Sequence, residues 1–206
     1  MKKILSIDFD IIMYPCIKLY ERQTSGDANP VSLWSHLNHE FNIDSFVRYD
    51  AQVLKNIAKL IQNNVKNGAK LYNIDEHHGI VHELKGQENY NDETYELTNI
   101  DFHHDLWYSD NDKIDAADFD TYRCNNWIGY LYLQKKLDNL VWVKAPNSEM
   151  PVIESEEVII NEIKTLGAIS ELATDFDEIY FCFSPQWVPH QYRHIFDLIT
   201  SLIKED

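Results

Sequence analysis

The chain has 206 residues, of which 44% are hydrophobic and 13% aromatic, and this composition excludes a disordered chain. With 34 acidic against 18 basic side chains, its formal net charge is −16. Such a surface repels phosphate backbones and anionic membranes, so we expect no nucleic-acid partner and no membrane partner. It favours a basic ligand such as an arginine-rich peptide, although acidic surfaces also simply aid solubility.

The sequence pattern predicts neither a membrane-spanning segment nor a signal peptide. No apolar run approaches the roughly 20 residues that cross a bilayer, and the start MKKILSIDFD is too short and too acidic for a signal peptide. The three cysteines, Cys16, Cys124 and Cys182, have no paired spacing, and their odd number is typical of reduced thiols. These features predict a cytoplasmic protein.

Strand-like and helix-like stretches alternate along the chain. Short apolar runs predict five strands, at 2–9, 69–75, 95–101, 139–144 and 178–184. Helical spacing predicts helices that begin near Asp50 and end at Gly68, and at 120–137, 157–166 and 190–203. In the last helix we expect an apolar face of Ile195, Leu198, Ile199 and Leu202. The alternation predicts one α/β domain over 1–206, with a mainly parallel sheet flanked by helices.

Acids and histidines follow three of the predicted strands at the point where each ends. The first strand ends in SIDFD, the second in DEHHG (75–79) and the third in DFHHD (101–105). Residues two apart in a strand point the same way, which would bring together Asp8 with Asp10 and also Asp101 with His103 and Asp105. Because ligands bind at the carboxyl ends of parallel strands, we expect all three sets to meet.

Four carboxylates and one or two imidazoles in one place indicate a metal site. Buried together without a cation, the carboxylates would repel one another, and desolvation would add to the cost. Oxygen-rich ligands with imidazole suit Mn²⁺ better than a thiolate-rich zinc site, with Zn²⁺ and Fe²⁺ as alternatives. Alone, SIDFD is typical of a solvated strand end, DEHHG is a weak signal, and DxHxD fits a ligand set or a surface turn equally well. The three together predict a metal site, and this many carboxylates favour two metal ions that share bridging oxygens.

These motifs resemble the arginase and deacetylase superfamily, the ureohydrolases. SIDFD is similar to that family's SxDxD strand, and DEHHG to its Gly-Gly-Asp-His-Ser segment. IDFHHDL is similar to its IDAHxDL strand, matching at Asp101, His103, Asp105 and Leu106. More narrowly, the short length, HHD, Asn-Asn-Trp (125–127) and FCFSPQW resemble the peptide arginases, which convert arginine side chains in ribosomally made precursor peptides to ornithine.

The resemblance implies a set of ligands for two Mn²⁺ ions. Asp8 and Asp101 would bridge them, Asp105 would share one ion with an incoming histidine, and His103 and Asp10 would bind the other. The incoming histidine is expected to be His77, because IDEHH parallels IDFHH, with His78 as the alternative. His104 points opposite to His103 in a strand and is expected to pack.

The resemblance also implies hydrolysis of an arginine side chain of a precursor peptide to ornithine and urea. The catalytic candidates are Asp105, which would move a proton towards the leaving amine, His78 and Glu76. Trp107 and Trp187 are the candidates for substrate binding, since a guanidinium stacked on an aromatic ring gains about 0.5–2 kcal/mol.

The sequence departs from the family in three ways. The SxDxD strand comes first here, whereas it follows the other two in ordinary arginases, so an arginase-like fold would have a permuted strand order. Met13 takes the place of the family's third aspartate, and no carboxylate matches the one that binds the guanidinium, although Asp75 and Glu76 are candidates. The alternatives are a deacetylase or amidohydrolase of the same superfamily and a non-catalytic binder of basic peptides. A dinuclear phosphoesterase is disfavoured by the acidic charge.

Overall fold

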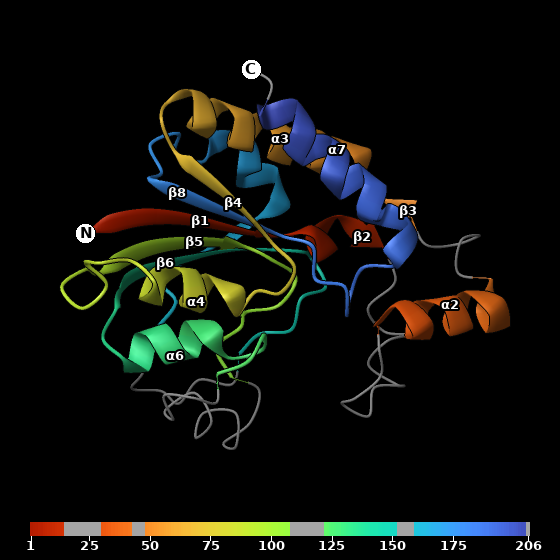
Figure 1. Ribbon diagram of the computed structural model, residues 1–206, viewed down its shortest axis with the longest axis horizontal. Helices are drawn as coiled ribbons and strands as arrows, with labels where there is room; N and C mark the ends of the chain where they lie inside the picture. The colour runs from red at the N-terminus through yellow and green to blue at the C-terminus, as the bar shows by residue number, and fades with distance from the viewer. Residues whose placement is uncertain (15–29, 43–47, 108–121, 152–158, 205–206) are drawn as a thin grey trace.

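The computed structural model describes residues 1–14, 30–42, 48–107, 122–151 and 159–204. Its centre is a six-stranded sheet in which every neighbouring pair is parallel, in the order β4-β8-β1-β5-β6-β7 (Figure 1). The strands are β1 (Lys2–Asp8), β4 (Lys70–Ile74), β5 (Tyr95–Ile100), β6 (Leu137–Lys144), β7 (Glu162–Thr165) and β8 (Glu178–Cys182). The predicted α/β architecture with a parallel sheet is confirmed.

Helices cover both faces of this sheet. The helices are α2 (Pro30–Phe41), α3 (Ala51–Lys66), α4 (Gly79–Lys85), α6 (Trp127–Leu133) and α7 (Arg193–Lys204), with 3-10 turns η1 (Phe9–Ile12), η3 (Leu166–Glu171) and η4 (His190–Tyr192). Helices α3 and α7 lie over one face and α4 and α6 over the other (Figure 1). Within the described part of the chain, none of these helices has the length and apolarity needed to cross a membrane.

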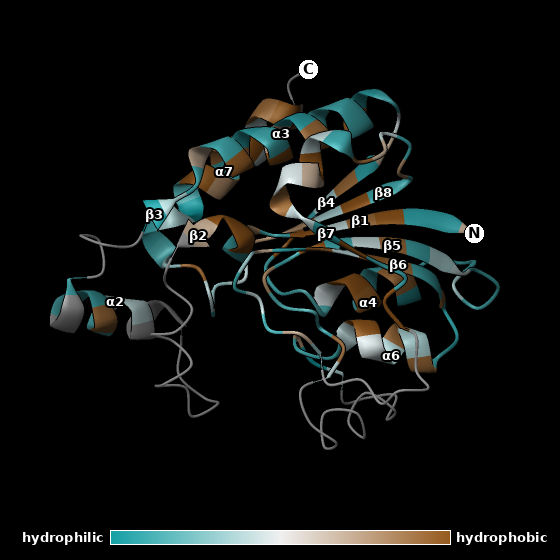
Figure 2. Cartoon of the chain, turned by 180° about the vertical axis from the view of Figure 1, so that it is seen from behind, coloured by the Kyte–Doolittle hydropathy of each residue, from teal (hydrophilic) through white to brown (hydrophobic). Residues whose placement is uncertain are grey.

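The core forms two layers because neighbouring strand residues point to opposite faces. In β8, Ile179 and Phe181 pack with α3 and α7, whereas Tyr180 packs with α4 and α6. Strand β1 begins with hydrophilic residues and becomes hydrophobic further along (Figure 2). The middle of β1 therefore packs in the core, and its carboxyl end carries the polar side chains of Ser6 and Asp8.

The helix predicted from Asp50 to Gly68 is confirmed as α3. The Asp50 carboxylate accepts hydrogen bonds from the backbone N–H groups of Gln52 and Val53, at 2.9 and 3.0 Å, and so caps the first turn. Gly68 follows the helix with a φ of +103°, a conformation that residues other than glycine rarely adopt. Both ends of α3 are thus set by local sequence.

Two predicted helices are wrong in part. Of 120–137, the described residues form only α6, and Leu137 already begins β6. Of 157–166, residues 162–165 form the edge strand β7, because their backbone pairs with β6 and tertiary hydrogen bonding outweighs local preference. A second small sheet pairs β2 (Met13–Tyr14) with β3 (Arg48–Tyr49).

The apolar face of the last helix also differs from the prediction. Leu198 and Leu202 are 55% and 57% exposed, whereas the buried hydrophobic residues of α7 are Phe196, Ile203 and the predicted Ile199. The helix begins later than predicted, since 190–192 form η4, and it is rotated so that the phenyl ring of Phe196 stacks on Phe181 of β8. One large aromatic contact decides which side faces the sheet.

Candidate metal centre

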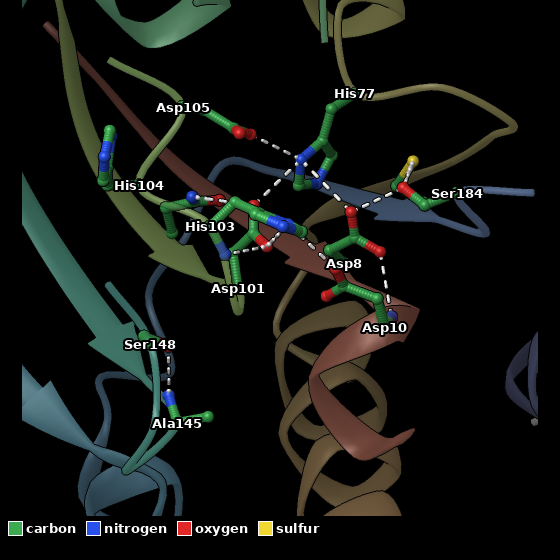
Figure 3. A network of polar contacts seen from close by, with 12 residues as sticks. Asp8, Asp10, His77, Asp101, His103, His104, Asp105, Ala145, Ser148 and Ser184 are labelled. Atoms are coloured by element: carbon green, nitrogen blue, oxygen red, sulfur yellow. Dashed lines mark hydrogen bonds and ion pairs between the residues drawn. The ribbon is translucent and has the colours of Figure 1, made fainter. Parts of the chain in front are cut away.

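The carboxyl ends of β1, β4, β5 and β8 meet at one edge of the sheet. There the six residues predicted as metal ligands come together, five of them nearly fully buried (Figure 3). They are Asp8, Asp10, His77, Asp101, His103 and Asp105.

Asp8 and Asp10 reach this centre through a turn. Strand β1 ends at Asp8, whose Oδ1 accepts a hydrogen bond of 2.9 Å from the Asp10 backbone N–H and caps η1. The other oxygen, Oδ2, accepts a hydrogen bond from the Ser184 hydroxyl. The predicted convergence of the two aspartates is confirmed, but the reason given for it, alternation along a strand, is wrong.

The segment after β5 is likewise irregular. The strand ends at Ile100, and Asp101 accepts a hydrogen bond of 2.9 Å from the backbone N–H of His103 through Oδ1. Asp105 has a φ of +50°, in the left-handed region. Turns therefore orient these side chains, and the alternation predicted for 101–105 is wrong.

Helix α6 fixes Asp105. The Trp127 indole N–H donates to Asp105 Oδ2 at 2.6 Å, and the Asp105 carbonyl oxygen accepts from the N–H groups of Ile128 and Gly129, at 3.0 and 3.3 Å. A Cβ on Gly129 would lie 2.4 Å from the carbonyl oxygen of Leu106, closer than atoms can approach. Only glycine lets the helix come near enough to make these bonds.

The ligand atoms form two groups that share Asp101. One consists of Asp10, Asp101 and His103, the other of His77, Asp101 and Asp105, and in each the ligand atoms lie within 4.8 Å of one another. His77 Nδ1 lies 2.9 Å from Asp105 Oδ2 and 3.1 Å from Asp101 Oδ2. His103 Nδ1 lies 3.1 Å from Asp10 Oδ2. Asp8 adjoins the second group, with Oδ2 3.5 Å from His77 Nδ1.

Burial and mutual repulsion perturb the carboxylates strongly. Burial and the charges of Asp8 and Asp101 raise the pKa of Asp10 to about 8, and burial and the charge of Asp101 raise that of Asp105 to about 7. Burial also raises the pKa of Asp8 to about 6. For Asp101, burial opposes ionisation, but His77 and His103 outweigh it and lower the pKa to about 2.

The carboxylates around His77 and His103 favour the charged form of both imidazoles. Burial favours the neutral form of His103, but its close contact with Asp10 and the charge of Asp101 raise the pKa to about 9. The pKa of His77 is also raised despite burial, chiefly by the charge of Asp8. Without a cation, the protein thus relies on protons and two imidazolium rings to offset the carboxylates.

The burial of Asp10 favours a bound cation. Both carboxylate oxygens of Asp10 are fully buried, and the contact of Oδ2 with His103 Nδ1, at 3.1 Å, lacks favourable hydrogen-bond geometry. This contact leaves part of the desolvation cost, which is on the order of several kcal/mol, uncompensated, since the pKa of Asp10 stays raised to about 8. A bound cation removes this cost, and the oxygen-rich, imidazole-containing ligands suit divalent first-row metals. These clusters could therefore hold a metal ion.

The structure brings His77, and not His78, into the ligand cluster. His77 Nε2 lies 3.3 Å from the Ser6 hydroxyl, which leaves Nδ1 facing the carboxylates. His78 is partly exposed and pairs with Glu76, Nε2 to Oε2, at 3.3 Å. His104 packs edge-on against Trp142 as expected, and burial lowers its pKa to about 4.

A pocket of about 280 Å³ opens over the cluster. Four of the ligands line its floor, and its walls include Cys124, Asn125, Glu149, Gln186 and Trp187. The ring of Trp187 lies 4.6 Å from that of His103, centroid to centroid. Trp107, the other predicted substrate-binding residue, lies elsewhere, and so do the catalytic candidates His78 and Glu76.

Trp107, His78 and Glu76 are not among the described residues of the pocket lining. Trp107 is 5% exposed and packs in the core with Tyr132. Its position after a strand end looks suited to substrate contact, but the close approach of α6 buries it. Glu76 lies near the pocket instead, where it accepts a hydrogen bond of 2.8 Å from the pocket residue Gln186.

Three residues of the centre have no role assigned from sequence. Trp127 and Ser184 hold carboxylates in place, and Cys182 adjoins Asp8 and His77. The signal in the sequence that could locate them is their position within two motifs, Asn-Asn-Trp (125–127) and FCFSPQW (181–187). Comparison of the chain with protein-family models, curated proteins and solved structures found no match.

Proposed function

We propose that this protein is a binuclear ureohydrolase of arginase-like, permuted fold, which hydrolyses arginine side chains of a precursor peptide to ornithine and urea. The observation that supports this most is the sharing of Asp101 between two ligand groups, from which His77, His103 and Asp105 line a pocket. A carboxylate common to two cations is what a binuclear hydrolytic centre requires.

The two groups of ligands would hold two Mn²⁺ ions. Asp10, Asp101 and His103 would bind one, and His77, Asp101 and Asp105 the other, with Asp8 next to His77. When bound, such a pair supplies a water molecule of lowered pKa as nucleophile near neutral pH. That chemistry is needed because the guanidinium cation is stabilised by resonance and reacts slowly with ordinary water.

Asp105 is the residue best suited to move protons. Its carboxylate lines the pocket, and the Trp127 N–H fixes Oδ2. A carboxylate held in this place can accept a proton from the attacking water and deliver it to the leaving nitrogen. Urea then leaves, and the ornithine side chain remains in the peptide.

The pocket walls favour a cationic side chain. Among the described residues that line the pocket, none is Lys or Arg, whereas Asp8, Asp105 and Glu149 are acidic. Trp187 offers a ring on which a guanidinium can stack. A volume of about 280 Å³ is near the lower bound for ligand sites, roughly 300 Å³, and so suits one side chain whose peptide stays outside.

Glu149 is the best candidate for the carboxylate that binds the guanidinium. Asp75 and Glu76 are the candidates from the sequence. However, Asp75 Oδ1 already pairs with Arg193 Nη1 at 2.6 Å, and Glu76 already accepts a hydrogen bond from the Gln186 side chain. Glu149 is exposed within the pocket lining, where its carboxylate can meet an incoming guanidinium.

The proposal is tested by product analysis. Purified protein loaded with Mn²⁺ is given an arginine-containing peptide, and urea and the peptide mass are measured together. We expect urea with a matching conversion of arginine to ornithine, both lost in Asp101→Asn, and a raised KM in Glu149→Gln. Deacylation of an acyl-lysine peptide in place of urea would favour the deacetylase alternative. Peptide binding without any product would favour the non-catalytic binder, and absence of metal binding would overturn the metal centre.

A further inference from the structure

A third group of potential ligands lies at the same edge of the sheet. Cys182, the last residue of β8, is the register partner of Asp8 in β1, and His77 approaches both from the turn after β4. One ligand atom from each lies within 4.8 Å of the other two. All three side chains are at most 3% exposed.

The chemistry of this group differs from that of the other two. Those offer only carboxylate and imidazole, which suit Mn²⁺, whereas this one adds a sulfur ligand. A thiolate with imidazole and carboxylate favours Zn²⁺ or Co²⁺, and three protein ligands leave a fourth tetrahedral position open. We propose that Asp8, His77 and Cys182 form a third cation position, selective for Zn²⁺-like ions over Mn²⁺.

The neighbouring hydroxyls support this arrangement. Ser184, whose φ is +50°, places its Oγ 3.3 Å from Cys182 Sγ and donates to Asp8 Oδ2. Ser6 Oγ lies 3.3 Å from His77 Nε2. Each of the three ligands thus has an oriented polar neighbour, as metal ligands usually do. A cysteine that only fills space needs no such neighbours.

The third position competes with the binuclear arrangement, because it uses Asp8 and His77. When a Zn²⁺-like ion is bound by Cys182, Asp8 and His77 are its ligands too and are no longer available to bind Mn²⁺. The inference concerns metal choice and does not depend on the proposed substrate. When the ion binds, the S–H bond breaks, the sulfur–metal bond forms and the proton passes to the buffer.

Co²⁺ serves as the probe, because its spectrum reports sulfur ligation directly. Metal-free, reduced protein is titrated with Co²⁺ under anaerobic conditions. Visible bands report cobalt bound through any ligands, and near-ultraviolet charge-transfer absorption reports a sulfur–cobalt bond. We expect both signals in the native chain, and Zn²⁺ to abolish the sulfur signal at a concentration at least about tenfold lower than Mn²⁺.

The cysteine variants make the test specific. Cys182→Ser and Cys182→Ala, the second of which keeps an apolar side chain in the core, should lose the near-ultraviolet signal. The double variant Cys16→Ser/Cys124→Ser should keep it. Visible bands without the sulfur signal, or a sulfur signal that survives removal of Cys182, would overturn the third position. Urea measured on the native protein separates the proposals, because either result can be obtained without the other.

Discussion

Replacing Asp10 by Asn should stabilise the metal-free protein and weaken the metal-bound one. Asp10 is fully buried, and its contact with His103 Nδ1 at 3.1 Å does not offset burial and the neighbouring carboxylates, because the pKa of Asp10 stays raised. In the metal-free protein its charge is therefore a burden that Asn, nearly equal in shape, does not carry. With metal bound, the same charge becomes a ligand. Asp10→Asn should therefore raise the stability of the metal-free protein and lower that of the metal-bound protein.

The magnitude follows from the pKa of Asp10, which burial and two neighbouring carboxylates raise from 3.8 to about 8. Because the folded-state pKa is the higher one, this group's contribution to stability is complete below pH 4 and is lost as the pH rises to 8, where the loss approaches roughly 6 kcal/mol. Local relaxation lowers such costs, so we expect metal-free Asp10→Asn to gain about 2–5 kcal/mol at pH 8 and little at pH 4.

Thermal and denaturant unfolding measure this gain. In chelator at pH 8, Asp10→Asn should raise Tm by roughly 5–15 °C, whereas saturating Mn²⁺ should stabilise the native chain far more than the variant. Asp138→Asn, at an exposed position of β6, is the matched control and should change stability by less than about 0.5 kcal/mol. A variant no more stable than the native chain in chelator, or equal stabilisation of both by Mn²⁺, would refute the reasoning.

Three further predictions concern the frame of the centre and its protons. Gly129→Ala should destabilise by about 1–3 kcal/mol in urea unfolding, because its Cβ would meet the Leu106 carbonyl oxygen at 2.4 Å, whereas Gly167→Ala, with 3.8 Å to the nearest atom, should not. Trp127→Phe removes the 2.6 Å bond to Asp105, and calorimetric Mn²⁺ titration should show affinity lowered by about tenfold; unchanged affinity would mean the bond is incidental. Mn²⁺ affinity should rise from pH 6 to pH 8, because Asp8, Asp10 and Asp105 have raised pKa values and must release protons before they can bind the metal. Calorimetric titrations in buffers of different ionisation enthalpy count the released protons, and a count of zero would contradict this prediction.

The sequence was sufficient to predict which candidate metal ligands meet, although not how they are held, and it did not predict the pocket walls. Asp8 and Asp10 stand at alternate positions, and so do Asp101 and His103, which favoured strand geometry. In the structure both strands end earlier, and a 3-10 turn and an irregular segment direct the side chains. Strand order placed these chain segments at one edge, and that part of the inference needed no knowledge of local angles.

The supporting residues could not be predicted, because their roles depend on contacts between distant segments. Trp127 lies 22 positions from Asp105, and Ser184 lies 176 positions from Asp8. Hydrophobic periodicity gives no sign of such a hydrogen bond. The same limitation explains the last helix, where periodicity alone offered Leu198 as a core residue and the stacking of Phe196 on Phe181 decided otherwise.

The position of β1 affects when during synthesis this centre can form. Among the strands of the parallel sheet, β1 comes first along the chain and β8 last, yet they are neighbours in the middle of the sheet. Until β8 has left the ribosome, the aspartates at the end of β1 lack one of their two flanking strands. Pairing over so long a separation is slow, so we expect the nascent chain to remain without this centre until β8 has emerged and paired with β1. Any uptake of metal would then follow the folding of β8 and could not begin at the N-terminal strand alone.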